Sequence, residues 1–249
     1  MIEHAVIQNT PEWEMLRAGI PTASCFSEII TPAKLELSKS RFPYMCKLLA
    51  EWIQGCPMEE ASTAWMKEGH EREDQTVAAY ELARDCEVEP CGFFTLNDGT
   101  VGASPDRIRR AIRRGIEAKS PQLPAMVGYL LGQGLDDKYR IQLYGQTWVC
   151  EFEGVDVVAW NPLVPARALV VVETHADDKN DTGKVYVRAI EKAVTDFRDE
   201  LMEARILIEQ RYGKIAREVK PKATTVEEDP FGITDADLAA ILANVKGDK

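Results

Sequence analysis

The chain has 249 residues, of which 45% are hydrophobic and 29% charged, and this composition excludes a disordered or collagen-like protein. Its 41 acidic and 30 basic residues give a net charge of -11, which argues against a protein that coats nucleic acid by charge alone. An enzyme acting on nucleic acid is not excluded, because such an enzyme needs basic residues only along its groove.

No apolar run approaches the roughly 20 residues that a membrane-spanning helix needs. The first residues, MIEHAVIQNTPEWE, lack the basic and apolar regions of a signal peptide. Six cysteines at irregular spacing are typical of reduced thiols rather than of a disulfide scaffold or a zinc site. We therefore expect a cytoplasmic protein with no membrane partner.

The N-terminal third is predicted to be helical. The segment TPEWEMLRAGIPTASCFSEII predicts two short helices separated at Gly19 and Pro21, with Thr22 or Ser24 able to cap the second. Apolar side chains at helical spacing predict two more helices, over residues 43–54 and 62–84. Residues 87–120 then change period, because the short segments GFFTL, TVGAS and GIEAK are β-prone and separated by turn residues, which predicts a β-meander.

The second half alternates again. Residues 122–150 predict helix, VDVVAW and ALVVVET predict strands, and a long amphipathic helix is expected over about 188–212. This order predicts an α/β or α+β protein with a central mixed sheet flanked by helices. We expect one domain over residues 1–213, a linker over 214–233 and a tail over 234–249, where ITDADLAAILANV forms either a partner-docking helix or a frayed end.

The candidate chemistry lies on the predicted meander, where ten residues separate Ser104-Pro105-Asp106 from Glu117-Ala118-Lys119. Strand alternation places Glu117 and Lys119 on one face. If the strand that carries Asp106 pairs beside them, two carboxylates and an ammonium converge, and Mg2+ prefers such oxygen ligands for phosphodiester hydrolysis. The alternative is a hairpin with a solvated Glu–Lys pair that contributes under about 1 kcal/mol.

These residues resemble the PD-(D/E)XK nuclease pattern, and four further features resemble its lambda-exonuclease or viral alkaline exonuclease branch, the YqaJ-type viral recombinases. The segment WEMLRAGIPTAS, from Trp13 to Ser24, is similar to the family's W-x-x-x-R-x-G-x-x-T-A-S. GHERE, followed by Tyr80-Glu81, is similar to a helical G-x-x-x-E element. The family's Ala-Ser-Pro-Asp and its Y-x-x-Q helix are matched at residues 103–106 and 139–149.

The resemblance implies a restriction-endonuclease-like core and a Mg2+-dependent 5′-to-3′ exonuclease on double-stranded DNA ends. Such an enzyme uses metal-activated water, with two Mg2+ ions, or Mn2+ in their place, and leaves 3′ single-stranded overhangs for recombination. The family further implies a homotrimer, a single-strand annealing recombinase as partner, and a bacterial host cytoplasm for a phage- or prophage-encoded chain. A structure-specific or restriction-type endonuclease of the same fold is the alternative, and a non-catalytic DNA-end or recombinase-binding module is a further one.

Each site residue follows from its position in the motifs. The resemblance implies that Asp106 and Glu117 are the main metal ligands, with the carbonyl of Ala118 and Glu73 completing the set, and that Lys119 positions the nucleophilic water. Glu71 is a rival for Glu73 and faces elsewhere on the helix. The resemblance also implies phosphate or DNA contacts from a second group of side chains: Arg17, Ser24 and Gln142.

Two departures from the family pattern bear on these assignments. Tyr144 stands where many members carry a second glutamine and Gln146 follows it, so the polar group that reaches the active site is left open among Gln142, Tyr144 and Gln146. Arg107 replaces a frequent glycine and extends a basic run, which we interpret as a phosphate-binding rim or as a solvated hairpin. The run consists of Arg107, Arg109, Arg110, Arg113 and Arg114.

Overall fold

The computed structural model describes residues 1–58, 64–133, 137–165, 169–176 and 182–215, with the side chains of 64–71 and 137–138 left out. The described residues belong to one compact unit. The predicted linker and tail lie almost entirely outside them, so their boundaries stay predictions. Among the described residues, no helix is both long and apolar enough to cross a bilayer.

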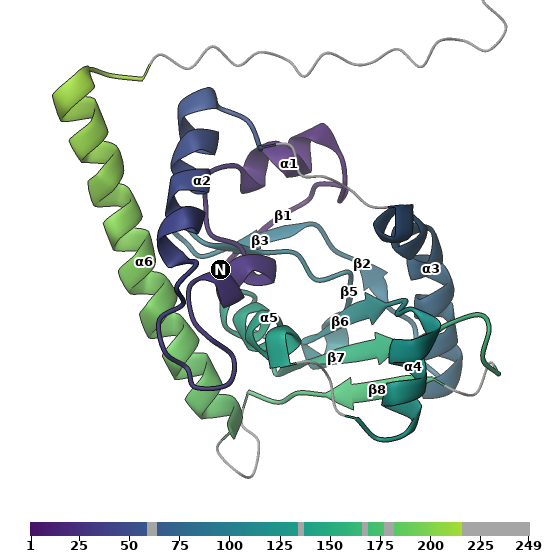
Figure 1. The fold of residues 1–249 in the computed structure, drawn as a ribbon. Helices are drawn as coiled ribbons and strands as arrows, with labels where there is room; N and C mark the ends of the chain where they lie inside the picture. Colours follow the sequence, from purple (N-terminus) through teal and green to yellow (C-terminus); the bar gives the residue numbers. More distant parts are fainter. Residues whose placement is uncertain (59–63, 134–136, 166–168, 177–181, 216–249) are drawn as a thin grey trace, which may run out of the picture. The chain divides into compact units, whose positions relative to one another are not determined.

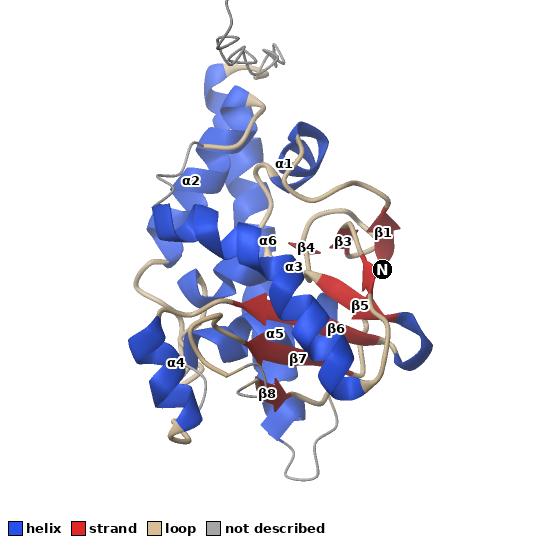
Figure 2. Ribbon diagram, turned by 90° about the vertical axis from the view of Figure 1, so that its right-hand side faces the viewer, coloured by secondary structure: helices blue, strands red, loops and turns tan. Residues whose placement is uncertain are grey.

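A five-stranded sheet is the centre of the fold, in the order β2 (Glu89–Pro90), β5 (Arg107–Arg109), β6 (Arg114–Lys119), β7 (Gly154–Ala159) and β8 (Val170–Glu173). Strands β6 and β7 are parallel and the other pairs antiparallel, which confirms the predicted mixed sheet. Helices α3 (Ala64–Arg84) and α5 (Asp137–Val149) cover opposite faces (Figures 1 and 2).

Alternation along the two central strands sends successive side chains to different helices. Ile116 and Val158 pack with Tyr80 of α3 in a small buried cluster. Val155 and Val157 belong instead to the main core, together with apolar residues of α5. Since Glu117 follows Ile116, it points to the α5 side of the sheet.

The predicted meander is split between two sheets. GFFTL and TVGAS contribute β3 (Phe93–Thr95) and β4 (Gly102–Ala103), which pair with β1 (Ile2–His4) in a separate three-stranded sheet, whereas GIEAK is part of β6. Strand β1 was not predicted, because three residues are too few to show a period of their own. The chain passes from one sheet to the other at Ser104-Pro105-Asp106.

The N-terminal helices form largely as predicted. Thr10 caps α1 (Pro11–Arg17) by accepting a hydrogen bond from the Trp13 amide, and a 3-10 helix, η1 (Ala23–Glu28), follows. Thr22 stands at the N-cap of η1 without a capping bond from its side chain. Helix α2 (Arg41–Gln54) ends at Gly55, whose φ of 73° is left-handed.

Two predicted boundaries are wrong. The single helix expected over 122–150 is divided into α4 (Leu123–Leu130) and α5, because the chain turns at Gly132 with φ +84°. The last helix, α6 (Thr182–Tyr212), begins before residue 188. Its first turns are rich in β-prone residues, but Tyr186 stacks on Tyr144 of α5, and tertiary packing overrides local propensity.

Helix α5 is held tightly between its neighbours. A Cβ at Gly145 would lie 2.6 Å from the Phe26 ring, so only glycine lets η1 pack this closely on α5. Helix α6 also packs on α5, and its residues Ile190, Val194 and Phe197 are buried in the main core. These contacts fix the position of α5 relative to the face of β6 that carries Glu117.

Candidate active site

The carboxylates of Asp106 and Glu117 meet where β5 begins and β6 ends. The Asp106 amide donates to the Ile116 carbonyl (3.1 Å), and Asp106 Oδ2 accepts from the Ala118 amide (2.7 Å), so the chain folds Asp106 against the middle of β6. Burial and the nearby negative charge of Glu117 raise the pKa of Asp106 well above its usual range, although Lys119 opposes the shift. Burial is the largest cause of this rise, and the neighbouring carboxylate of Glu117 adds to it.

Glu117 is 3% exposed and accepts three side-chain hydrogen bonds. Lys119 Nζ and Gln142 Nε2 donate to Oε1 at 2.5 and 2.7 Å, and Gln146 Nε2 donates to Oε2 at 2.7 Å. The predicted shared face of Glu117 and Lys119 is therefore confirmed. Both glutamines of α5 reach the site, whereas Tyr144 is turned away and stacks on Tyr186.

Lys119 is held as a cation. Burial disfavours its charged form, but the charges of Glu117 and Asp106 and the hydrogen bond to Glu117 outweigh burial, and together they raise its pKa. Its Nζ also lies 5.4 Å from the centre of the Tyr139 ring. In the metal-free protein, the two carboxylates therefore favour the protonated form of Lys119.

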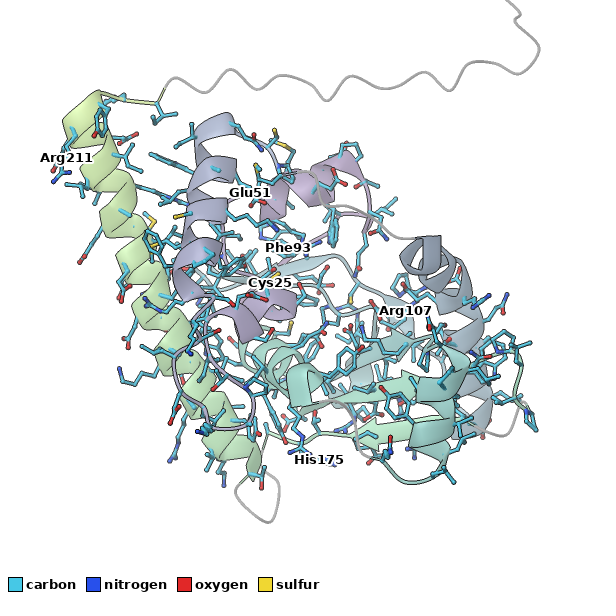
Figure 3. The ribbon with its side chains drawn as sticks, in the orientation of Figure 1. Cys25, Glu51, Phe93, Arg107, His175 and Arg211 are labelled. Carbon is cyan, nitrogen blue, oxygen red and sulfur yellow. The ribbon has the colours of Figure 1, made fainter. Side chains whose placement is uncertain are left out.

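Glu73 on α3 lies near Asp106 and contributes to the rise of that residue's pKa. Its Oε1 accepts a hydrogen bond from Arg107 Nη1 (2.9 Å), which also donates to the Asp106 carbonyl (2.7 Å). Arg107 Nη2 binds Asp74 at 2.6 Å, so Arg107 joins α3 to the sheet (Figure 3). The side chain of Glu71, the rival of Glu73, lies outside the described residues.

The donor atoms at this site fit a hard divalent cation. Asp106 and Glu117 offer carboxylate oxygens, which Mg2+ and Mn2+ prefer, and Mg2+ commonly uses only one or two protein carboxylates. Within the described ranges, no three His, Cys, Asp or Glu side chains come close enough to hold a metal by themselves. A cavity of about 570 Å³ beside Asp106 is lined by Glu73, Arg107 and residues 5–9.

The first motif is joined to the site through Trp13. Its Nε1 donates to Ser104 Oγ (2.8 Å), two residues before Asp106, and the Arg17 guanidinium stacks over the Trp13 ring at 3.9 Å. The end of α1 is thereby held next to the Ser-Pro-Asp segment. Ser24 is exposed on η1, with its Oγ 3.4 Å from the Thr22 hydroxyl.

The span that contains these motifs, residues 12–153, matches the model of the YqaJ-like viral recombinase domain. The chain belongs to this family. The match confirms the resemblance predicted from the five motifs, including the Trp13, Asp106 and Tyr139 segments. No protein in the curated comparison set matches this YqaJ-like chain.

Solved structures share the fold of this YqaJ-like domain. Two structures of the alkaline exonuclease LHK-Exo from Laribacter hongkongensis, one in complex with dAMP, are 23% and 24% identical, with TM-scores of 0.69 and 0.70. Each covers 83% of this chain and 100% of its own. A phage-related exonuclease from Haemophilus somnus 129PT is 12% identical, with a TM-score of 0.58, and covers 74% of this chain and 96% of its own.

The fold gives the arginines of the basic run different surroundings in this YqaJ-like chain. Arg110 pairs with Glu3 and Glu89, so carboxylates offset its charge as they do for Arg107. Arg109 lies near Tyr80, whose influence raises the pKa of Arg109. Contacts of Arg107, Arg109 and Arg110 with DNA stay predictions. Arg114 does not belong to a rim: it is 7% exposed and its Nε binds Asp156 at 2.5 Å, a correction that follows from its inward position on β6.

Gln146 is one of the three residues among which the polar group at the site was left open, and it contacts Glu117. The signal for it was present, because residues 142 and 146 are four apart and therefore lie on one face of a helix. Gln142 was expected at a phosphate, and the structure places its amide on Glu117 instead. A contact between Gln142 and DNA stays a prediction.

Proposed function

We propose that this protein is a Mg2+-dependent exonuclease that digests the 5′-ended strand of duplex DNA and leaves 3′ overhangs for recombination. The observation that carries the proposal is the convergence of Asp106, Glu117 and Lys119 at one end of β6. Membership of the YqaJ-like viral recombinase family supports it, as does a fold shared with LHK-Exo and the Haemophilus protein, both described as exonucleases.

Asp106, Glu117 and the carbonyl of Ala118 would hold the cation, with Glu73 completing the set directly or through water. One or two Mg2+ ions, or Mn2+ in their place, supply the charge that polarises the phosphoryl oxygen and acidifies the attacking water. The ammonium of Lys119 has three N–H donors, so its bond to Glu117 leaves others to hold that water and to stabilise negative charge on the phosphate. The released products carry 5′-phosphates.

Binding of the terminal 5′-phosphate of the DNA is assigned to Arg17 and Ser24. Arg17 carries a planar fork suited to phosphate oxygens, and its stacking on Trp13 holds it near Ser104. The hydroxyl of Ser24, near the start of η1, would donate to the same phosphate. Arg107, Arg109, Arg110 and Gln142 are proposed as further contacts along the DNA.

An exonuclease and an endonuclease of this fold differ in their need for a DNA end. We expect the protein with Mg2+ to digest a linear duplex and to leave the covalently closed circular form of the same DNA intact. Gel analysis of both substrates, with EDTA as the metal-free control, measures this difference. Cleavage of the closed circle at a comparable rate would indicate a structure-specific or restriction-type endonuclease, and binding without cleavage would indicate a non-catalytic module.

Polarity is tested separately at Arg17. Arg17→Ala should slow digestion of 5′-phosphorylated ends by about tenfold or more, because a charge-assisted bidentate contact contributes roughly 1.5–3 kcal/mol. Digestion of 5′-hydroxyl ends should change much less. End-labelled duplexes of both kinds, assayed with Arg17→Lys as the charge-conserving control, measure the ratio. Equal slowing on both ends would remove Arg17 from the terminal-phosphate role.

Three further parts of the proposal rest on the family alone. The protein would assemble as a homotrimer around DNA, deliver its single strand to an annealing recombinase, and act in the cytoplasm of a bacterial host. Light scattering of the full chain would measure the number of subunits.

A further inference from the structure

The two oxygens of the Glu117 carboxylate accept different numbers of hydrogen bonds from the three donors around it. Oε1 accepts from both Lys119 and Gln142, whereas Oε2 accepts from Gln146 at 2.7 Å. A carboxylate oxygen accepts two hydrogen bonds or ligands in its plane. The described contacts therefore occupy Oε1 and leave one acceptor position on Oε2, the oxygen that Gln146 orients.

Among the described residues, Glu117 is the group through which Gln146 can influence a reaction. It is 1% exposed, on the buried face of α5, so neither solvent nor a substrate outside the protein reaches it. Its amide nitrogen must face Glu117, because the reversed amide would place oxygen against a carboxylate oxygen. The packing of Phe26 on Gly145 holds this turn of α5 in place.

The stability of the core does not account for a glutamine at this position. Its Oε1 is buried and has no hydrogen-bond partner among the described residues, and an unsatisfied buried oxygen costs free energy. An apolar side chain of similar length, such as methionine, would avoid that cost on the same helix face. The contact that offsets the cost is the hydrogen bond to Glu117 Oε2.

We infer that Gln146 is a positioning residue for the divalent-metal site: together with Gln142 it clamps Glu117 and directs the free acceptor position of Oε2 toward the cation. This inference deepens the proposed function and rests on it. Gln142 and Gln146 then act as a pair, one on each oxygen of the same carboxylate. Loss of Gln146 would leave Glu117 attached by Oε1 alone and free to rotate.

The test measures metal binding rather than activity alone. Titration calorimetry of the full-length, metal-free protein with Mn2+ should show a Kd about 10–100-fold weaker for Gln146→Met than for the wild type, the usual effect of losing a residue that orients a metal ligand. The matched control is Thr147→Val, which removes a polar group of similar burial on the same helix, bonded to the Leu143 carbonyl and not to Glu117. This control should bind Mn2+ as the wild type does.

Kinetics separate positioning from substrate contact. With linear duplex DNA, Gln146→Met should lower kcat at limiting Mn2+, recover at saturating Mn2+, and leave the KM for DNA unchanged. Circular dichroism checks folding, and Gln146→Leu replaces Gln146→Met if that variant is unfolded. Wild-type Mn2+ affinity in both folded variants would overturn the inference while leaving the nuclease proposal intact. Absence of Mn2+ binding by the wild type would overturn both.

Discussion

Asp106→Asn should abolish Mg2+-dependent digestion of linear duplex DNA, with kcat lowered by at least about 1000-fold. The charge that a bound cation places on the phosphate contributes several kcal/mol, and each 1.36 kcal/mol is a factor of ten in rate. Asparagine keeps the size of the side chain, and its carbonyl can still accept from the Ala118 amide. The loss would therefore report the missing charge and not a misfolded site.

A control and a stability measurement accompany this variant. Asp196→Asn removes an exposed carboxylate that pairs with Lys192 on α6, and it should digest DNA at the wild-type rate. Wild-type cleavage by Asp106→Asn would refute the metal assignment. Without metal, Asp106→Asn should melt at a higher temperature than the wild type at neutral pH, because it removes a partly buried carboxylate beside Glu117.

The same measurement has a defined pH dependence. Burial and Glu117 raise the pKa of Asp106 in the folded protein above its unfolded value, so the neutral form is favoured by folding. The stabilisation is complete below the unfolded pKa and is lost as pH rises through the folded pKa. The difference in melting temperature between Asp106→Asn and the metal-free wild type should therefore shrink on acidification.

Lys119→Met should lower kcat by about 100- to 1000-fold, the usual cost of removing one group that stabilises charge in the transition state. Metal binding should be retained or tightened, because the variant removes a positive charge at 2.5 Å from Glu117 Oε1. Single-turnover cleavage and Mn2+ calorimetry measure the two effects. Loss of metal binding together with cleavage would instead indicate that Lys119 only maintains the fold.

The pH profile distinguishes a cation from a base at this position. Because the charges of Glu117 and Asp106 outweigh burial and raise the pKa of Lys119, wild-type cleavage should not depend on Lys119 losing its proton near neutral pH. Lys119→Arg keeps the charge with a different geometry and should recover part of the lost rate. A rate that rises with pH in the wild type, and does not rise in Lys119→Arg, would favour a general base.

Features of the site that depend on residues close together in the sequence were predictable. The shared face of Glu117 and Lys119 follows from strand alternation, and the helices near residues 43–54 and 62–84 follow from helical spacing. The approach of Asp106 to β6 was predicted on the condition that the strand carrying Asp106 pairs beside β6. The residues between them are enough for such a hairpin, and β5 does pair with β6. Five ordered motifs were also enough to predict the family, which the match over residues 12–153 confirmed.

Contacts between distant segments were decided by the tertiary structure. Arg107 meets Glu73 across 34 positions and Arg114 meets Asp156 across 42, so neither partner is visible in any local pattern, and both arginines were interpreted only as members of a basic run. Likewise, the turn of α5 that brings Gln146 to Glu117 is set by the packing of η1 and α6. Local periodicity thus determined which residues share a face of a helix or strand. The packing of the layers decided which charged side chains each face contacts, because a buried polar group needs a partner and that partner can come from a distant part of the chain.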